Sequence, residues 1–490
     1  MQPKTSALYS TTTVPELFLS AFKAFPERLA LADSNQQLTY REVAAKSFQI
    51  AHLLKLKGMK RQDTVALLLS NNIDSLVTLI AVQLLGLRYI SLHPMASESD
   101  HCFVLQDAQA RMLIADGIKF PERVQALYQK NTVEQVLTLA PSSIDAGLLQ
   151  QALTMSTEPI SIESQPDDFT KISYSGGTTG RSKGILQTHR TAITMVTYQL
   201  AYYEWPQNIR FLATTPISHA AGSFVLPIFL RGGTMHLLDK YAANSFMEYV
   251  AQHQINASFM VPTQIYTLLD YPQLDQTKLS SLEYILYGAS PMAPSRLLEA
   301  LQKIGPVFGQ LYGQAEAPMM ISYLRKEDHD PSRPHLLRSC GRVIPGNTVK
   351  LLDTELNEVP TGEIGEICVR GPLVMEGYLN RHEENEKVFA GQWLHTGDMA
   401  RQDEQGYLYI VDRAKDMIIS GGFNVYPSEI ENCLATHPAI AMSAVIGVPH
   451  EKWGEEVTAI VVLKPGTKPS EKELIDFVLK EKGPVNTPKA

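Results

Sequence analysis

The segment from Tyr174 to Gly184 holds the densest group of residues that could bind an anion. It reads Tyr-Ser-Gly-Gly-Thr-Thr-Gly-Arg-Ser-Lys-Gly and follows a strand-like stretch at 171–174. Glycines let the backbone turn its N–H groups toward an anion. Threonine hydroxyls can donate to phosphate oxygens, and a lysine adds a point charge. The segment has neither a Gly-Lys-Ser/Thr triplet nor a Gly-x-Gly-x-x-Gly pattern, so we predict a phosphate loop of another kind.

Eight further motifs follow this segment along the chain. They are Pro216-x-x-His219-x-x-Gly222, Tyr287-Gly288-Ala289-Ser290, Gln310-x-Tyr312-Gly313-x-x-Glu316, Gly341-Arg342-x-x-Pro345-Gly346, Gly362-Glu363-x-Gly365-Glu366, Trp393-x-x-Thr396-Gly397-Asp398, Asp412-Arg413-x-Lys415-Asp416 and Gly421-Gly422-Phe423-Asn424-Val425-Tyr426-Pro427-x-Glu429. In this order the segments resemble the adenylate-forming superfamily, which includes the AMP-dependent acyl-CoA synthetases.

The resemblance implies an ATP-dependent ligase that acts on a carboxylic acid. In such enzymes the carboxylate attacks the α-phosphorus of ATP, with Mg²⁺ present, and gives an acyl-adenylate and pyrophosphate. A small domain then swings about a hinge, and the thiol of coenzyme A displaces AMP. The protein mainly positions groups and stabilises charge. The apolar stretch 220–230 favours a hydrophobic acid, such as a fatty acid.

The resemblance also assigns roles to individual residues around the phosphates and the metal. The residues that would hold the β- and γ-phosphates are Ser175, Gly176, Gly177, Thr178, Thr179, Gly180 and Lys183. Thr178 and Glu316 would orient Mg²⁺, for which a carboxylate is a suitable hard ligand.

The remaining assignments concern adenosine, the acid and the hinge. Tyr312 would stack on adenine, Asp398 would accept hydrogen bonds from the ribose hydroxyls, and Arg413 would reach the ribose and phosphate. His219 would line the acyl pocket, and Lys415 falls on the hinge. The other residues near adenine would be Gly288, Ala289, Ser290, Gln310, Leu311 and Gly313, and the loop that enters for thioester formation would be Gly421 and Gly422.

The sequence departs from the family pattern at two places that bear on catalysis. Ala315 stands where a threonine commonly contacts the phosphate of AMP. Members of the family also end with a Gly-Lys segment whose lysine assists adenylation, and no Gly-Lys pair follows Lys415 here. We therefore expect a C-terminal domain that is incomplete at its end and an adenylation step that is slow, because one preorganised donor at a charged transition state is worth roughly 10²–10³ in rate.

Alternating strand and helix patterns must position these residues. Val65–Leu69 reads as a buried strand and Ile73–Leu85 as the helix after it, which predicts layered α/β sheets that are largely parallel. Ligands gather at the carboxyl ends of such strands. Further predicted strands are Arg210–Pro216, Ala257–Val261 and Glu283–Tyr287, and a β-rich section contains Val349–Leu352, Ile364–Arg370 and Gly406–Val411.

We predict a large AMP-binding body at 1–413 and a small, mobile α+β domain at 414–490. The predicted strands of the small domain are Met417–Ser420, Ile440–Val448 and Val457–Leu463, and its helices are Ser428–Ala435 and Glu471–Lys482. Both helices are expected to start with a capping box, Ser428 with Glu431 and Ser470 with Glu473.

Composition narrows the class of protein. The 490 residues carry 43 basic and 51 acidic side chains, a net charge of −8, so no nucleic-acid partner is expected. The 4 cysteines form no Cys-x-x-Cys pair, which argues against a zinc site or a disulfide framework. No signal peptide and no membrane-length apolar run is apparent, so we expect a cytoplasmic protein. A homodimer is left open.

Two alternatives compete with the CoA ligase. The acyl group could pass to a carrier-protein thiol, or the chain could be a non-catalytic relative that binds a nucleotide or an acyl-adenylate. A serine hydrolase is disfavoured because there is no Gly-x-Ser-x-Gly elbow, and a zinc hydrolase because there is no His-Glu-x-x-His.

Overall fold

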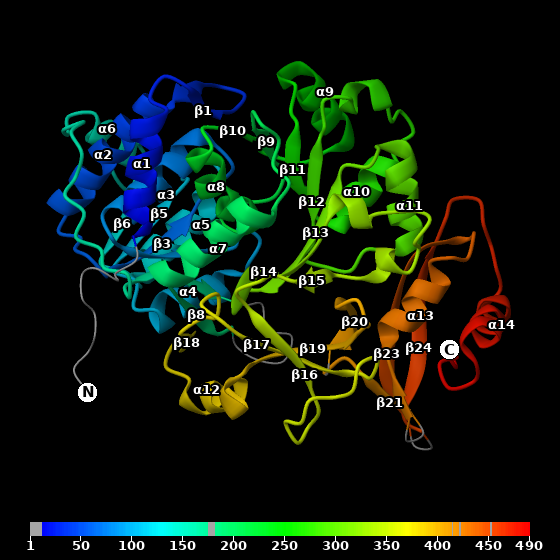
Figure 1. The fold of residues 1–490 in the computed structure, drawn as a ribbon. Helices are drawn as coiled ribbons and strands as arrows, with labels where there is room; N and C mark the ends of the chain where they lie inside the picture. Colours follow the sequence, from blue (N-terminus) through cyan, green and yellow to red (C-terminus); the bar gives the residue numbers. More distant parts are fainter. Residues whose placement is uncertain (1–11, 175–181, 414, 421–422, 451–452) are drawn as a thin grey trace.

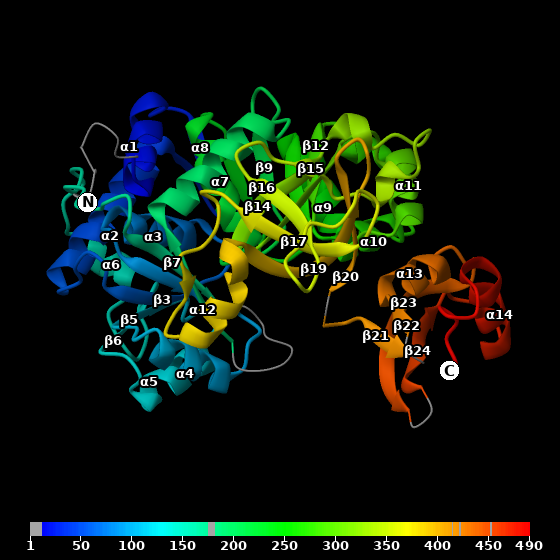
Figure 2. The same ribbon diagram turned by 60° about the horizontal axis from the view of Figure 1, so that its bottom comes forward.

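The computed structural model describes residues 12–174, 182–413, 415–420, 423–450 and 453–490. Three sheets organise this part of the chain, and two of them form the large body (Figure 1). The third belongs to a small C-terminal unit, coloured orange to red, that lies at one side of the large body in both views (Figure 2). The predicted α/β class is confirmed.

The 7-stranded sheet has the order β18-β8-β7-β4-β3-β5-β6. The strands from β7 to β6 run parallel, and β8 and β18 are antiparallel additions at one edge. Every residue of β3 is buried because helices cover both faces of the parallel part. The strands are β3 (Thr64–Leu68), β4 (Arg88–Ser91), β5 (Met112–Ala115), β6 (Gln135–Thr138), β7 (Phe169–Tyr174), β8 (Gly184–Thr188) and β18 (Gly377–Tyr378).

The 13-stranded sheet has the order β16-β17-β19-β20-β15-β14-β13-β12-β11-β9-β10-β1-β2. Read in this spatial order, the neighbouring strands between β13 and β1 pair in parallel, and the neighbouring strands between β16 and β13 pair antiparallel. The strands are β1 (Leu29–Ala32), β2 (Gln37–Thr39), β9 (Arg210–Ala213), β10 (Thr234–Leu237), β11 (Ala257–Met260), β12 (Tyr284–Tyr287), β13 (Phe308–Gln314), β14 (Ala317–Leu324), β15 (Gly341–Val343), β16 (Thr348–Leu352), β17 (Gly365–Arg370), β19 (Leu394–Gln402) and β20 (Tyr407–Arg413).

Helices cover the two large sheets. The α-helices are α1 (Val14–Ala24), α2 (Tyr40–Leu56), α3 (Ile73–Leu84), α4 (Glu98–Asp107), α5 (Pro121–Lys130), α6 (Leu148–Ala152), α7 (His189–Tyr202), α8 (Val225–Leu230), α9 (Ala243–His253), α10 (Pro262–Leu269), α11 (Pro294–Lys303) and α12 (His382–Val388). The short 3₁₀ helices are η2 (Ala220–Phe224), η3 (Gln276–Leu279), η4 (Lys326–Asp328), η5 (Leu336–Arg338) and η6 (Ala390–Gln392). Among the described residues, none of the helices is long and apolar enough to cross a membrane.

The small unit has a 4-stranded sheet in the order β22-β21-β24-β23, with two helices packed on it. Its elements are β21 (Ile418–Ser420), β22 (Phe423–Val425), α13 (Pro427–Leu434), β23 (Ile440–His450), β24 (Gly454–Leu463) and α14 (Glu471–Lys482). The sheet begins close to the predicted boundary, while the limits 1–413 and 414–490 stay a prediction.

The predicted capping box at Ser428 is wrong. Helix α13 begins one residue earlier, at Pro427, and the Ser428 hydroxyl donates to the carbonyl of Val411. The Glu431 carboxylate accepts from the backbone N–H of Val445 on β23. Both polar side chains therefore make tertiary contacts, which override the local pattern. At α14 half of the box is present, because Ser470 accepts from the N–H of residue 473.

The other strands and helices lie where the pattern predicts them, with small shifts at their ends. The largest shifts, of three residues, are in β9, which ends at Ala213 and not at Pro216, and in β24, which begins at Gly454 and not at Val457. The Thr214 hydroxyl donates to the carbonyl of Phe259 at 2.8 Å, so the chain leaves the strand at that residue.

Candidate active site

Asp398 lies at the centre of a buried hydrogen-bond network. Its side chain belongs to β19 and the residue is only 5% exposed. The Tyr312 hydroxyl and the Gln314 amide, both from β13, donate to Oδ2 at 2.7 and 2.6 Å. The Arg413 guanidinium from β20 lies 3.4 Å from Oδ1. The structure thus brings together three residues that the sequence predicted, and it adds Gln314. Burial and the neighbouring carboxylate raise the pKa of Tyr312 well above its usual value.

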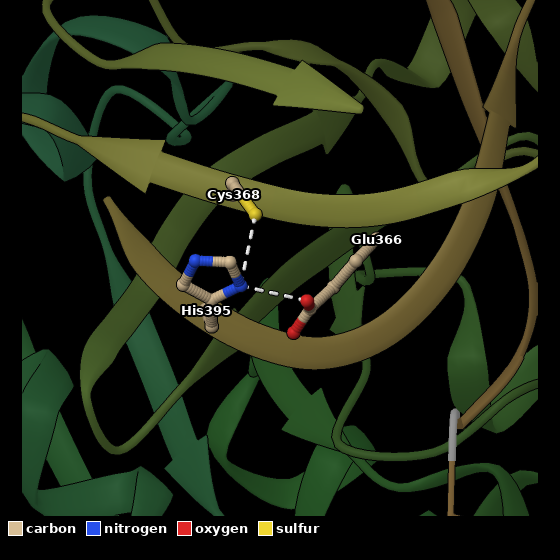
Figure 3. A group of neighbouring side chains, drawn as sticks. All are labelled: Glu366, Cys368 and His395. Carbon is tan, nitrogen blue, oxygen red and sulfur yellow. Dashed lines mark hydrogen bonds and ion pairs between the residues drawn. The ribbon is translucent and has the colours of Figure 1, made fainter. Parts of the chain in front are cut away.

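A second cluster supports the turn before Asp398. Glu366 on β17 accepts from the backbone N–H of Gly397 through Oε1, at 2.8 Å, and from His395 Nδ1 through Oε2, at 2.7 Å. The Cys368 thiol lies 3.5 Å from the same nitrogen (Figure 3). These side chains could hold a metal, since their ligand atoms lie within 4.8 Å of one another. Glu366 and His395 already bond to each other, however, so the cluster acts first as a support for the turn.

Glu316 and Lys183 both contact Tyr378. The Tyr378 hydroxyl on β18 donates to Glu316 Oε1 at 2.9 Å. The Lys183 ammonium lies 4.9 Å from the centre of the Tyr378 ring, which is a cation–π contact. Among the described residues, Glu316 Oε2 has no hydrogen-bond partner, so this oxygen can face a cation. The structure therefore places the predicted metal carboxylate beside the last residues of the predicted phosphate loop.

The backbone after β12 approaches β13 closely. A Cβ on Gly288 would lie 2.6 Å from the carbonyl oxygen of Leu311, so only glycine fits there without a shift. Ala289 adopts a φ of 69°, which is unusual for a residue with a side chain. Gln310 uses its side-chain oxygen to accept from the Tyr287 hydroxyl at 3.1 Å. The predicted adenine-binding segments 288–290 and 310–313 are thus neighbours.

A cavity of about 370 Å³ lies between the two large sheets and reaches these segments. Among the predicted residues it is lined by His219, Ala289, Leu311 and Gly313. Most of its wall is apolar, as expected for an acyl pocket, and comes from α1, α3, α7, η2 and α8: Val14, Phe18, Leu76, Leu79, Ile80, Ala192, Met195, Val196, Ala220, Val225 and Leu226.

His219 is neutral near pH 7. Its Nδ1 lies 2.8 Å from the Ser218 hydroxyl, and its ring makes an edge contact with the His93 ring at 4.6 Å. Burial first, and then the electrostatic effects of His93 and Lys171, lower the pKa of His219 to about 4. A neutral imidazole in an apolar cavity can accept or donate a hydrogen bond without adding charge.

Several predicted site residues lie outside the described residues. They are Ser175, Gly176, Gly177, Thr178, Thr179, Gly180, Gly421 and Gly422. Ser290 and Lys415 are described and exposed. The described residues that border this predicted phosphate loop are Tyr174 and Ser182.

Sequence reasoning missed Gln314, Tyr378 and Glu366 as parts of the site. Gln314 and Glu366 fall within recognised motifs, and each is a polar residue on a strand. Tyr378 lies on the short edge strand β18, far from every motif, and only its pairing with β8 brings it to Glu316. No local signal could have found it.

Two segments of the chain match known protein families. Residues 18–379 match the AMP-binding enzyme family, and residues 429–490 match the AMP-binding enzyme C-terminal domain. The first match covers well over half of the chain.

Individual relatives agree with the family match. The medium/long-chain-fatty-acid–CoA ligase FadD8 of Mycobacterium tuberculosis is 41% identical, over 98% of this chain and 86% of its own length. A feruloyl-CoA synthase from Amycolatopsis is 32% identical, over 92% and 89%. The ATP-bound structure of MatB from Rhodopseudomonas palustris superposes with a TM-score of 0.88 at 28% identity, over 98% and 94%. The chain therefore belongs to the AMP-binding enzyme family of adenylate-forming enzymes.

Proposed function

We propose that this chain is an AMP-forming acid–CoA ligase that acts on a largely hydrophobic carboxylic acid. The observation that carries the proposal is the junction at Gln314. This residue lines the apolar cavity and also donates to Asp398, so an acid in the cavity and a ribose at Asp398 would be immediate neighbours. Similarity to fatty-acid–CoA and feruloyl-CoA ligases supports the choice of coenzyme A as acceptor.

In this proposal the residues divide between nucleotide and acid. Asp398 would hold the ribose hydroxyls, Tyr312 and the backbone at 288–290 would contact adenine, and Arg413 would approach the α-phosphate. Lys183 and the segment 175–180 would neutralise the outer phosphates. His219 would lie beside the carboxylate in its neutral form. The carboxylate oxygen would then form a bond to the α-phosphorus as pyrophosphate leaves, and the CoA thiol would later displace AMP.

Mg²⁺ fits the donor set at Glu316. The carboxylate has one oxygen oriented by Tyr378 and one that is available to a hard cation. Thr178 would supply a hydroxyl from the phosphate loop. Mg²⁺ would supply charge neutralisation of the phosphates, while Tyr378 would keep the Glu316 side chain in one orientation. The hinge role of Lys415 and the thiol-path role of Gly421 and Gly422 are proposals of the same kind.

The test is a panel of carboxylic acids assayed for AMP formation with and without coenzyme A. The two half-reactions are followed separately, adenylation by ATP–pyrophosphate exchange and thioester formation from a supplied acyl-adenylate. We expect pyrophosphate exchange that depends on the acid and AMP release that depends on coenzyme A. Transfer to a carrier-protein thiol but not to coenzyme A, or tight ATP binding without pyrophosphate release, would contradict the proposal.

Two further properties stay predictions. We propose a cytoplasmic location, which fractionation of the producing cells would check. A homodimer would be detected by light scattering during size-exclusion chromatography.

A further inference from the structure

The cavity between the two large sheets, which would hold the acid, has one charged side chain among its described lining residues, Lys171. It lies on β7, where its backbone pairs with Tyr89 on β4 and with Gln187 on β8. Paired residues on neighbouring strands point to the same face of a sheet, so the three side chains form a polar row across the cavity wall. The Lys171 ammonium lies 5.7 Å from the centre of the Tyr89 ring.

The Lys171 ammonium lacks an anionic partner. Within the part of the chain that the structure describes, it makes no hydrogen bond or ion pair, and the Tyr89 ring is its one charge-stabilising contact. Residues 175–181, which follow β7 in the sequence, include no acidic residue. Burial without a partner lowers the pKa of Lys171 to about 8.

Such a lysine destabilises the protein in the absence of a ligand. Lys171 is partly buried in the cavity wall. Removing an ammonium even partly from water without an anionic partner opposes folding, and an apolar residue of similar size would avoid that cost. The nearby imidazoles do not offset this unfavourable burial. His219 and His93 both have lowered pKa values, and neither carries a negative charge that could pair with the ammonium. The missing partner of the Lys171 ammonium would therefore be a group on the ligand.

The position of Lys171 along its strand separates it from the reacting carboxylate. Lys171 precedes Ser175, where the phosphate loop starts, by four residues, and at about 3.3 Å per residue this is roughly 13 Å along the strand. Ser173 and Ser91 line the cavity between Lys171 and the end of the sheet. Because the nucleotide would lie beyond that end, Lys171 faces the acyl part of the substrate.

We propose that Lys171 selects acids whose acyl group carries a second oxygen function, a carboxylate or a ketone, over unsubstituted acids of the same length. This inference rests on the proposed function, because it assumes that the cavity holds the acid. The ammonium donates to the second oxygen function while the surrounding apolar wall holds the hydrocarbon. The pocket is thus largely hydrophobic with one fixed polar anchor.

The test compares the wild-type protein with Lys171→Met, which keeps an unbranched side chain only one atom shorter and removes its charge. Matched acids are used: an alkanoic acid, the α,ω-dicarboxylic acid and the oxo acid of equal chain length. We expect the wild-type protein to prefer the substituted acids in kcat/KM and in Kd from calorimetry. In Lys171→Met this preference should fall by about 10- to 100-fold, the usual value of a hydrogen bond to a charged group. Lys171→Arg should retain part of it.

Lys350→Met serves as the control, since Lys350 pairs with Glu358 on the exposed surface. It should change neither the preference nor the unfolding temperature. Lys171→Met without ligand should unfold at a higher temperature than the wild type, because the unpaired cation is gone.

Two outcomes would overturn the inference. In one, Lys171→Met weakens all three acids equally, which would assign the lysine to the reacting carboxylate. In the other, it changes none of them. Calorimetry decides between these results even if no acid supports AMP formation, so failure of the proposed ligase activity is distinguishable from failure of the inference.

Discussion

Replacing Asp398 by asparagine should weaken ATP binding while leaving the fold intact. The asparagine oxygen can take the place of Oδ2 and keep the donors from Tyr312 and Gln314. Its NH₂ group then stands where Oδ1 faces Arg413 at 3.4 Å and where a ribose hydroxyl would donate. One hydrogen bond to a charged group is lost, worth about 1.5–3 kcal/mol. At about 1.4 kcal/mol per factor of ten, KM for ATP should rise roughly 10- to 100-fold.

The same protein offers a matched control. Asp328 is also buried, at 7% exposure, and accepts from the Tyr407 hydroxyl at 2.7 Å, with Arg333 at 3.9 Å. Asp328→Asn therefore removes a similar buried charge outside the proposed site. Acid-dependent ATP–pyrophosphate exchange measures KM for ATP, and thermal unfolding measures stability. If Asp328→Asn raises KM as much as Asp398→Asn does, or if neither raises it, the role given to Asp398 is refuted.

Three further perturbations test other parts of the structure. Tyr378→Phe removes the donor to Glu316, which should raise the Mg²⁺ concentration for half-maximal exchange about 5-fold, as for the loss of about 1 kcal/mol; an unchanged Mg²⁺ titration would contradict this. Gly288→Ala places a Cβ 2.6 Å from the Leu311 carbonyl, so the free energy of unfolding from urea titration should fall by about 1–3 kcal/mol, and an unaltered midpoint would be evidence against the close approach. Burial lowers the pKa of His189 from 6.5 to about 4, so the unfolded chain takes up a proton first and stability should fall as pH drops from about 6.5 to 4; His189→Asn should flatten this slope, and an equally steep slope would exclude His189 as its source.

The sequence predicts those parts of the fold that depend on local patterns. Strands such as β3 and β12 are short apolar runs between turns, and both lie where the pattern predicts them. The capping box predicted at Ser428 is absent because both side chains bond to other elements. The Ser428 hydroxyl donates to a carbonyl of β20, and the Glu431 carboxylate accepts from an N–H of β23. Contacts between distant elements decided that case, and local spacing carries no information about them.

The same distinction holds for the candidate site. Motif order predicted Tyr312, Asp398 and Arg413, and these residues do meet. Tyr378 could not be predicted because its role depends on the pairing of β18 with β8. The sequence identifies Lys171 only as a lysine in a predicted strand. Its lack of a carboxylate partner among the described residues depends on how the two sheets pack, which local sequence does not encode.

The junction of β13 and β14 explains how one short segment can serve two substrates. The pairing register shifts between Tyr312 and Gln314, which marks a bulge. Bulges redirect side chains and are frequent beside active sites. Here the Gln314 side chain donates to Asp398, and the carbonyl of Ala315 accepts from Gln187 on the cavity wall at 2.7 Å. The Glu316 side chain, next along the chain, accepts from Tyr378 on β18. A regular strand would send alternate side chains to opposite faces. Because Ala315 and Glu316 form the turn that follows the bulge, three consecutive residues face the proposed ribose site, the proposed acid cavity and Tyr378. An attack of the carboxylate on the α-phosphorus would require this proximity.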